Sequence, residues 1–356
     1  MVENSSKRSE ARPEPSSCRL GFQRRRTGGH CSVTRLPPPR LTEHHISRYR
    51  TTGLFVLLAA LWGSSFVATR AALPYVPPVL LAALRFDIAG VVTLGYAVIS
   101  TDQWRPTSRA GWMEVATGGL LFVAAHHALL FIGQQYVTSA VASVVISLDP
   151  VLAAVFSGLL LADERVTRTE AIGIAFGVAG ATLIATPSTS TLVTTDVRGV
   201  VLVFLAAAAF ALGAVLTKRY RTAIPIQSMQ AWMMLIGAVL LHATSIGLPK
   251  ESLTSVIWTP VAIAALGYLS LIAAGVGYLI YFTLLDRIGP IQINLIGYVA
   301  PVFAALNGWL LLGETITVPT VLGFMIVTTG FGVAKFEEIT EEAECLYQHA
   351  PVLERD

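Results

Sequence analysis

Ionisable side chains lie within long apolar stretches of this sequence, among them Arg85, Asp87, His126, His127 and Asp149. A charge at the centre of a bilayer costs on the order of 3 kcal/mol on insertion scales, so each requires a reason. Imidazole titrates near neutral pH and could serve proton coupling, and a carboxylate could bind a proton or another cation. These residue types indicate ion coupling or recognition of a substrate head group.

A structural role competes with a functional one at each of these positions. Arg85 and Asp87 are two residues apart, so on a helix they point in different directions and cannot pair side by side. Arg85 could gate or snorkel as readily as contact substrate, and Asp87 could pair with a cation on a neighbouring helix. Asp149 precedes Pro150, where the backbone leaves helical geometry. Its carboxylate could cap the helix that follows or bind a proton.

The two adjacent histidines do not predict a metal site. Two ligands on one helix chelate well at a spacing of i, i+4, and His126 and His127 are neighbours. Only one of the two can face a central cavity well, and either could simply hydrogen-bond a neighbouring helix. The three cysteines, Cys18, Cys31 and Cys345, lie in polar tails without a pairing pattern. With no nucleophile elbow and no phosphate-binding glycine loop, we expect no catalytic residue and no cofactor.

Neutral groups supplement these charges, mainly in the second half of the chain. Asn294, Tyr298 and Tyr278 are candidates to line a substrate path, as is Trp62 in the first half, where packing is the alternative. Glutamates that end two apolar stretches, Glu164 and Glu314, are expected in exposed caps or loops. Gln134 is expected at the membrane interface.

The elements that must position these residues are membrane-spanning helices. Hydrophobic residues make up 54% of the chain and charged residues only 13%, with a mean hydropathy of +0.64. A water-soluble domain needs about a quarter of its residues charged. Ten apolar stretches have close to the roughly 20 residues that a bilayer requires, and open strands are excluded there. They run approximately over 53–73, 78–100, 111–133, 139–161, 168–187, 198–218, 228–248, 259–285, 289–312 and 317–335.

The sequence pattern of the fourth and fifth apolar stretches is repeated in the ninth and tenth. The spacing Glu164-x8-Gly173-x6-Gly180 recurs as Glu314-x8-Gly323-x6-Gly330. Each block begins with Pro-Val, and both prolines, Pro150 and Pro301, fall in the middle of a span, where we expect a hinge or a kink. The glycines permit close packing of spans five and ten.

The duplication divides the chain into four parts. Residues 1–50 form a basic tail expected to be disordered, 51–187 and 198–335 are two copies of five helices, and 336–356 form an acidic tail. Basic residues gather in the connections on the side of both tails, which places both termini in the cytoplasm. Five spans per copy is an odd number, so the second copy is inverted relative to the first.

These residues resemble a known family. The sequence LWGSSFVATR at 61–70, ALRF at 83–86 and the two Pro…Glu…Gly blocks are similar to EamA-type transporters of the drug/metabolite transporter superfamily. The resemblance implies an all-α integral membrane protein with ten transmembrane helices as two inverted five-helix repeats. It also implies transport of small metabolites by alternating access. The second copy departs from the pattern, with Phe210-Ala211 where the first has Trp62-Gly63.

The sequence therefore predicts a secondary-active transporter in the plasma membrane, not an enzyme. We expect it to export small metabolites, amino-acid-like or amphipathic compounds, with Asp149 or a histidine of span three sensing protons. Its expected partners are a small-molecule substrate and the lipid bilayer, and not nucleic acid. The alternative is a membrane receptor or scaffold that retains the fold without transporting.

Overall fold

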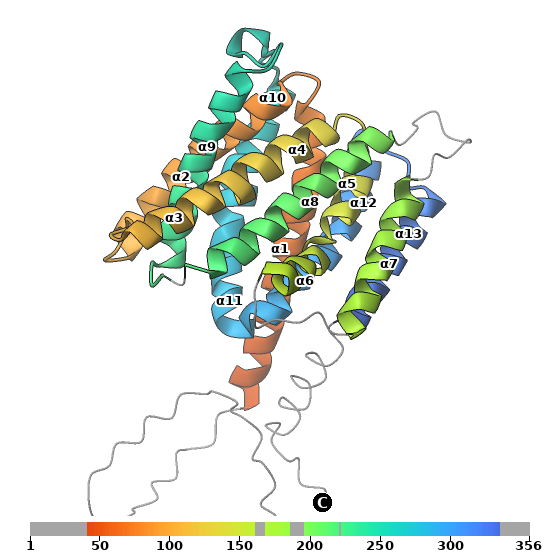
Figure 1. Ribbon diagram of the computed structural model, residues 1–356, viewed down its shortest axis with the longest axis horizontal. Helices are drawn as coiled ribbons and strands as arrows, with labels where there is room; N and C mark the ends of the chain where they lie inside the picture. Colours follow the sequence, from red (N-terminus) through yellow and green to blue (C-terminus); the bar gives the residue numbers. More distant parts are fainter. Residues whose placement is uncertain (1–40, 161–167, 186–195, 221, 335–356) are drawn as a thin grey trace, which may run out of the picture. The chain divides into compact units, whose positions relative to one another are not determined.

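The computed structural model describes residues 41–160, 168–185, 196–220 and 222–334, and every regular element in these ranges is helical (Figure 1). The first copy contains α1 (Leu41–Ala72), α2 (Pro78–Ser100), α3 (Arg109–Gly118), η1 (Gly119–Ala125), α4 (His126–Gly133), α5 (Ser139–Ile146), α6 (Asp149–Leu160) and α7 (Arg168–Ala185). The second contains α8 (Val197–Lys218), α9 (Ile226–Ile246), η2 (Leu253–Ser255), α10 (Pro260–Gly267), η3 (Tyr268–Val276), α11 (Gly277–Asn294), α12 (Ile296–Leu312) and α13 (Val318–Ala334).

The helices have the length and composition of membrane spans. In the described ranges, seven helices are long and apolar enough to cross a bilayer, and three shorter apolar helices occupy the places expected for spans five, nine and ten. The prediction of an all-helical membrane fold is confirmed. The helix bundle has two ends, each named here after an arginine. The Arg70 end is the one at which α1 ends and α5 and α13 begin. The Arg105 end is where α2 stops and α3 and α9 start.

Two helix boundaries differ from the sequence prediction. Helix α1 begins at Leu41, about three turns before the apolar residues begin, because nothing between Pro39 and the first span breaks a helix. Helix α11 continues through Asp286 and Arg287, where the sequence predicted the break between spans eight and nine. The turn lies at Leu295 instead. Charged residues change where a helix meets water, but they do not interrupt its backbone hydrogen bonds.

Spans three and eight, at corresponding places in the two copies, contain a π-helical segment each. In span three η1 joins α3 to α4, and in span eight η3 joins α10 to α11. A π-helical segment widens the turn and changes which side chains face the neighbouring helices, and such segments are frequent at functional sites. Both adjoin polar candidates: the two histidines follow η1, and Tyr278 follows η3. Tyr268, which the sequence did not single out, begins η3.

Span four is broken in the middle. Helix α5 ends at Ile146 and α6 starts at Asp149, with a turn between them. Pro150 is the second residue of α6, where its missing amide hydrogen costs no helical hydrogen bond. In the second copy Pro301 lies inside α12 instead, and the turn precedes that helix at Leu295.

The closest packing occurs between the copies rather than within them. Helix α7 lies along α13, α2 along α9 and α1 along α12 (Figure 1). Another set of contacts recurs when the copies are exchanged: α1 packs on η3 and α11, whereas α8 packs on η1 and α4. Helices α2 and α9 even start alike, each after a proline with nearly the same backbone angles (φ −55° and −56°, ψ 139° and 138°).

Glycines allow the contact between α7 and α13. A Cβ atom at Gly180 would lie 2.8 Å from the carbonyl oxygen of Gly323, and one at Gly330 would lie 2.9 Å from that of Gly173. Both distances are too short for a real side chain, so the two backbones approach where the repeated glycines permit it.

Candidate functional site

Trp62 on α1 is held by residues of the second copy. Its indole Nε1 donates to the carbonyl oxygen of Ala273 in η3 (3.1 Å). Its ring stacks on Tyr281, with centroids 5.6 Å apart, and meets the edge of Tyr278 at 5.9 Å. A Cβ atom at Gly277 would lie 2.9 Å from the indole nitrogen, so that glycine makes room for the ring. Trp62 therefore joins α1 to span eight.

The two residues after Trp62 join α1 to α12. Gly63 faces the carbonyl oxygen of Ala300 so closely that no side chain fits between the helices. The hydroxyl of Ser64 accepts a hydrogen bond from the side-chain amide of Asn307 (2.7 Å). The segment 61–70 thus makes hydrogen bonds to both span eight and α12 of the other copy.

Phe210 takes the corresponding place on α8. Its ring meets Phe122 of η1 at 4.7 Å and His126 of α4 at 5.2 Å. Trp62 against span eight and Phe210 against span three are therefore matching contacts of opposite copies. Phenylalanine has no indole nitrogen, so Phe210 cannot donate the hydrogen bond that Trp62 donates.

The seam between the copies is the surface where α1 packs on span eight and α12, and where α8 packs on span three and α6. Glu314 closes the Arg70 end of this seam. Both of its carboxylate oxygens accept from the backbone amide of Ser139 (3.1 and 3.0 Å), the first residue of α5, and Oε1 also accepts from its hydroxyl (3.2 Å). Arg70 Nε lies 3.9 Å from Oε1. A carboxylate at a helix N-terminus satisfies an amide without a helical partner and interacts favourably with the helix dipole.

The turn that places Glu314 there needs a glycine. Gly313 ends α12 in the left-handed region (φ 64°), and the amide of Glu314 then donates to the carbonyl of Gly308 (3.1 Å). The side chain of Glu314 is only 11% exposed. The prediction of an exposed cap or loop residue is wrong about exposure, because the helix that it caps belongs to the other copy and lies far away in sequence.

Burial raises the pKa of the Glu314 carboxyl above its ordinary value. The hydrogen bonds from Ser139 and the nearby charge of Arg70 act in the opposite direction, but burial is the largest effect. The protonated form of Glu314 is thus more accessible than that of a glutamate in water.

Gln134 belongs to the same closed end. The sequence predicted an interfacial position, but the residue is fully buried. Its side-chain amide donates to the carbonyl of Phe66 (3.1 Å), and its backbone carbonyl accepts from Arg70 (2.8 Å). These hydrogen bonds satisfy the side-chain nitrogen and the backbone carbonyl, whereas the side-chain Oε1 is buried without a hydrogen-bond partner among the described residues.

Arg85 lies at the centre of the aromatic groups on this seam. It is close enough to Tyr268 and Tyr278 of span eight, and to His126 and His127 of span three, to interact with them electrostatically. Within the described ranges its Nε has no hydrogen-bond partner. The guanidinium also lies over the ring of the adjacent Phe86, 5.0 Å from its centroid. Spans two, three and eight thus bring their polar candidates to one place.

The two histidines both lie within the helix bundle, but their rings contact different neighbours. Nδ1 of His126 is 2.9 Å from the carbonyl oxygen of Ala206 on α8. Nδ1 of His127 is 3.1 Å from that of Val123 in its own helical turn. Since a carbonyl only accepts, both rings carry a proton on Nδ1 and present Nε2 as the free acceptor when neutral. The ring of His127 meets Phe86, next to Arg85, at 4.5 Å.

Asp149 and Tyr298 form a second group. Asp149 begins α6, and its Oδ1 is buried without a hydrogen-bond partner in the described part of the chain. Tyr298, on α12, is close enough to Asp149 to interact with it electrostatically. The break in span four therefore places a carboxyl group beside a tyrosine of the other copy.

Two other candidates lie elsewhere. Asp87 accepts a hydrogen bond from His242 Nε2 on α9 (2.7 Å), and both side chains are about two-fifths exposed. This is the pairing with a neighbouring helix that the sequence left open for Asp87, although nothing in the sequence singled out His242. The side chain of Asn294 lies outside the described side chains.

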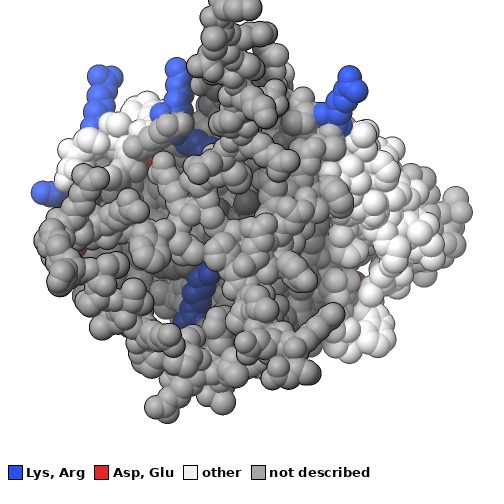
Figure 2. All heavy atoms as spheres, turned by 90° about the horizontal axis from the view of Figure 1, so that it is seen from below, with Lys and Arg blue, Asp and Glu red and all other residues white. Residues whose placement is uncertain are grey.

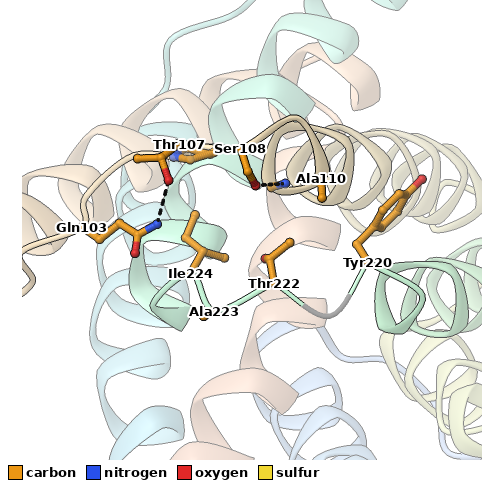
Figure 3. Close-up of a pocket in the computed structure, with 10 residues that line it drawn as sticks. Gln103, Thr107, Ser108, Ala110, Tyr220, Thr222, Ala223 and Ile224 are labelled. Atoms are coloured by element: carbon orange, nitrogen blue, oxygen red, sulfur yellow. Dashed lines mark hydrogen bonds between the residues drawn. The ribbon is translucent and has the colours of Figure 1, made fainter.

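A cavity of about 340 Å³ opens at the Arg105 end, away from the Glu314 cap. It lies between the α2–α3 loop and the α8–α9 loop, where Gln103, Thr107 and Ser108 face Tyr220 and Ile224 (Figure 3). Its lining residues are uncharged and include both polar and apolar side chains. None of the described residues forms a group of three or more histidine, cysteine or acidic side chains that could hold a metal ion.

The comparisons with known proteins agree with this architecture. Residues 51–186 and 197–334 both match the EamA-like transporter family. The chain is 26% identical over 301 residues to "Uncharacterized transporter YvbV" of Bacillus subtilis (strain 168), covering 85% of this chain and 96% of the relative. It is 27% identical over 266 residues to "Uncharacterized inner membrane transporter YedA" of Escherichia coli (strain K12), covering 74% and 84%.

A plant relative and a solved structure extend the similarity. "WAT1-related protein At3g02690, chloroplastic" of Arabidopsis thaliana is 27% identical over 296 residues, covering 78% of this chain and 67% of the relative. A crystal structure that is 22% identical covers 81% of this chain and 97% of its own, with a TM-score of 0.56. This likeness shows a shared fold.

Proposed function

The chain belongs to the EamA-like transporter family, and we propose that it is a secondary-active exporter of small metabolites, amino-acid-like or amphipathic, that works by alternating access. The relatives named as transporters support a carrier rather than an enzyme. The substrate path runs along the seam between the copies, where Trp62, Arg85 and the span-three histidines meet the tyrosines of span eight.

The orientation that we propose places both termini in the cytoplasm. Basic side chains support it: Figure 2, seen from the side on which α1 starts, shows Lys and Arg side chains with hardly any Asp or Glu among the described residues. With five spans in each copy, the second copy then faces the opposite way, which makes the duplication an inverted repeat. The Arg70 end is then the outer end and the Arg105 end the inner one.

The observation that carries the proposal is the difference between the two ends of the seam. At the outer end Glu314 caps α5 and lies beside Arg70, whereas a cavity opens at the inner end. A carrier loaded from the cytoplasm has this arrangement before export. The outer contacts then break as the copies rock, and Asp149 or a histidine of span three takes up or releases a proton during the cycle.

Flux measurements test the proposal. The full chain, reconstituted in vesicles, is offered a metabolite panel with and without an imposed pH gradient, beside empty vesicles. We expect saturable flux of at least one compound that responds to the gradient, and a weaker response in Asp149→Asn or His127→Gln. Flux that ignores the gradient in all three proteins contradicts proton coupling, and absence of any flux contradicts transport.

Labelling from each side separates a carrier from a receptor or scaffold. With the three native cysteines replaced by serine, Tyr298→Cys and Asp149→Cys are exposed to an impermeant maleimide from one side and then the other. A carrier exposes the seam to both sides in turn, so labelling should occur from both and change when transported compound is added. Labelling from neither side indicates a protein that keeps the fold without transporting.

A further inference from the structure

Arg85 is a partly buried cation for which no described residue supplies a compensating anion. Its Nε is inaccessible to water and makes no hydrogen bond with any described residue, and no described carboxylate lies within 4.0 Å of the guanidinium. A guanidinium is charged at every physiological pH, so the residue cannot escape the cost of burial by losing a proton. An uncompensated charge at this depth is rare and marks a site where a partner binds.

Carboxylates on neighbouring elements are engaged elsewhere. Asp87, on the same helix as Arg85, bonds His242. Glu114 accepts from the hydroxyl of Thr222, and Glu314 caps α5. Glu251 accepts from the backbone amides of Val79 and Leu80 (3.1 and 2.9 Å), in the first turn of α2. Asp149 has an unpartnered Oδ1, but it lies on α6 beside Tyr298 and not within 4.0 Å of the guanidinium. None of these carboxylates therefore balances Arg85.

The surroundings of Arg85 are aromatic. The ring of Phe86 lies beneath the guanidinium, and Tyr268 and Tyr278 approach from span eight. Behind Tyr278 the rings of Trp62 and Tyr281 stack on each other. Ring faces and edges offer apolar contact to a planar or aliphatic body, while the guanidinium offers paired donors to two oxygens.

We propose that Arg85 binds the carboxylate of an organic anion whose apolar or aromatic body lies against the rings of Trp62, Tyr278 and Phe86. The inference rests on the proposed function and names its substrate class. An organic cation would meet the like charge of Arg85. A small inorganic anion would leave the aromatic surface unused.

Thermal stabilisation of the purified full chain tests this site without requiring transport. The probes are phenylacetate, benzoate and indole-3-carboxylate, each beside its amide, with phenethylamine as the cation and sodium phosphate as the inorganic anion. The proteins are wild type, Arg85→Lys, Arg85→Gln and, as a matched loss of an exposed charge, Arg198→Gln. We expect the carboxylates to raise the melting temperature of wild type and Arg198→Gln more than the other probes do.

The two Arg85 variants separate binding from structure. Arg85→Gln should lose the response to carboxylates, with the half-saturating concentration raised about tenfold or more, and Arg85→Lys should keep part of it. Without any probe, Arg85→Gln should melt at or above the wild-type temperature, because it removes an unbalanced buried charge. A structural or snorkelling role predicts the opposite, a lower melting temperature. An equal response of Arg85→Gln to carboxylates, or equal stabilisation of wild type by amides, amine or phosphate, overturns the proposal.

The binding experiment and the flux experiment can contradict the two proposals independently. If carboxylates bind through Arg85 but no panel compound crosses the vesicle membrane, the anion site stands and the transport proposal falls. If a panel compound is transported equally by wild type and Arg85→Gln, transport stands and the anion site falls. No stabilisation of wild type by any of the three carboxylates also overturns the anion site.

Discussion

At the scale of single residues, Glu314 connects parts of the chain that the sequence keeps far apart. Its carboxylate caps α5 of the other copy through Ser139 and lies beside Arg70 of α1. Single contacts of this kind are modest, about 0.5–2 kcal/mol for a helix cap and less for the partly exposed ion pair. Their position decides their importance, because they close one end of the seam between the copies.

Removing the Glu314 carboxyl should lower stability and change its dependence on pH. We expect Glu314→Ala to lower the free energy of unfolding by about 1–2 kcal/mol, whereas the same change at exposed Asp102 should cost about 0.5 kcal/mol or less. Because the folded state raises the pKa of Glu314, the folded protein binds this proton more tightly than the unfolded chain. The contribution of this group to stability is therefore full below the ordinary glutamate pKa and declines as pH rises through the raised one.

Melting temperatures measured from about pH 4 upward check both effects. The difference between wild type and Glu314→Gln isolates the titration, since glutamine keeps an acceptor for Ser139 but does not ionise. A wild-type curve parallel to that of Glu314→Gln over the whole range would show that the carboxyl does not titrate differently in the folded state.

At the scale of elements, irregular helices occur at related places in both copies. The π-helical segments η1 and η3 lie in spans three and eight, and span four is broken before Asp149. Each irregularity lies on the seam next to a polar candidate. The pairs α2 with α9 and α7 with α13 contain no such irregularity. Glycines, rather than polar groups, allow α7 and α13 to pack closely.

Alanine substitutions at two glycines of α13 separate the effect of helix packing on stability from the effect of helix propensity. A Cβ atom at Gly330 would lie 2.5 Å from Cβ of Phe176 on α7, whereas one at Gly332 would meet nothing within 4 Å. Gly330→Ala should therefore destabilise by about 1–3 kcal/mol, and Gly332→Ala should be neutral or stabilise by up to about 1 kcal/mol. Thermal unfolding of the purified variants measures both. Equal melting temperatures for the two variants would mean that α7 and α13 do not pack as described.

At the scale of the whole molecule, the two copies depend on each other. Helices α1, α2 and α7 all find their most extensive partners in the second copy. The apolar and small-residue surfaces that they bury there would otherwise face lipid or one another. In a bilayer, where apolar surface alone gives little association energy, these close contacts and hydrogen bonds are what hold the copies together.

Splitting the chain between the copies should leave two fragments that are stable only together. Residues 1–190 and 191–356, expressed separately, should each be degraded or aggregate, because α2, α7, α9 and α13 lose their partners. Coexpression with a tag on one fragment should recover both in a single peak on size-exclusion chromatography. A first fragment that is monodisperse by itself would show that its helices pack mainly within the copy.

The sequence alone determined the class of the molecule and which polar residues are candidates for its site. The ten spans, the duplication and the polar candidates are local properties of composition and spacing, which a bilayer makes decisive because it tolerates neither unpaired backbone nor unexplained charge. Arg85 and the two histidines were identified this way. The turn at Leu295 and the π-helical segments were not, since backbone irregularity depends on packing against helices elsewhere in the chain.

Only the tertiary structure decided which candidates meet. It brings Arg85 and the histidines together with the tyrosines of span eight, pairs Asp87 with His242, and buries Glu314 at a helix end more than 170 positions earlier in the chain. The repeated Glu164 and Glu314 were visible in the sequence as a pattern, but their spacing carries no information about a partner in the other copy. Contacts between copies are long-range, and a single sequence records only the residues that make them.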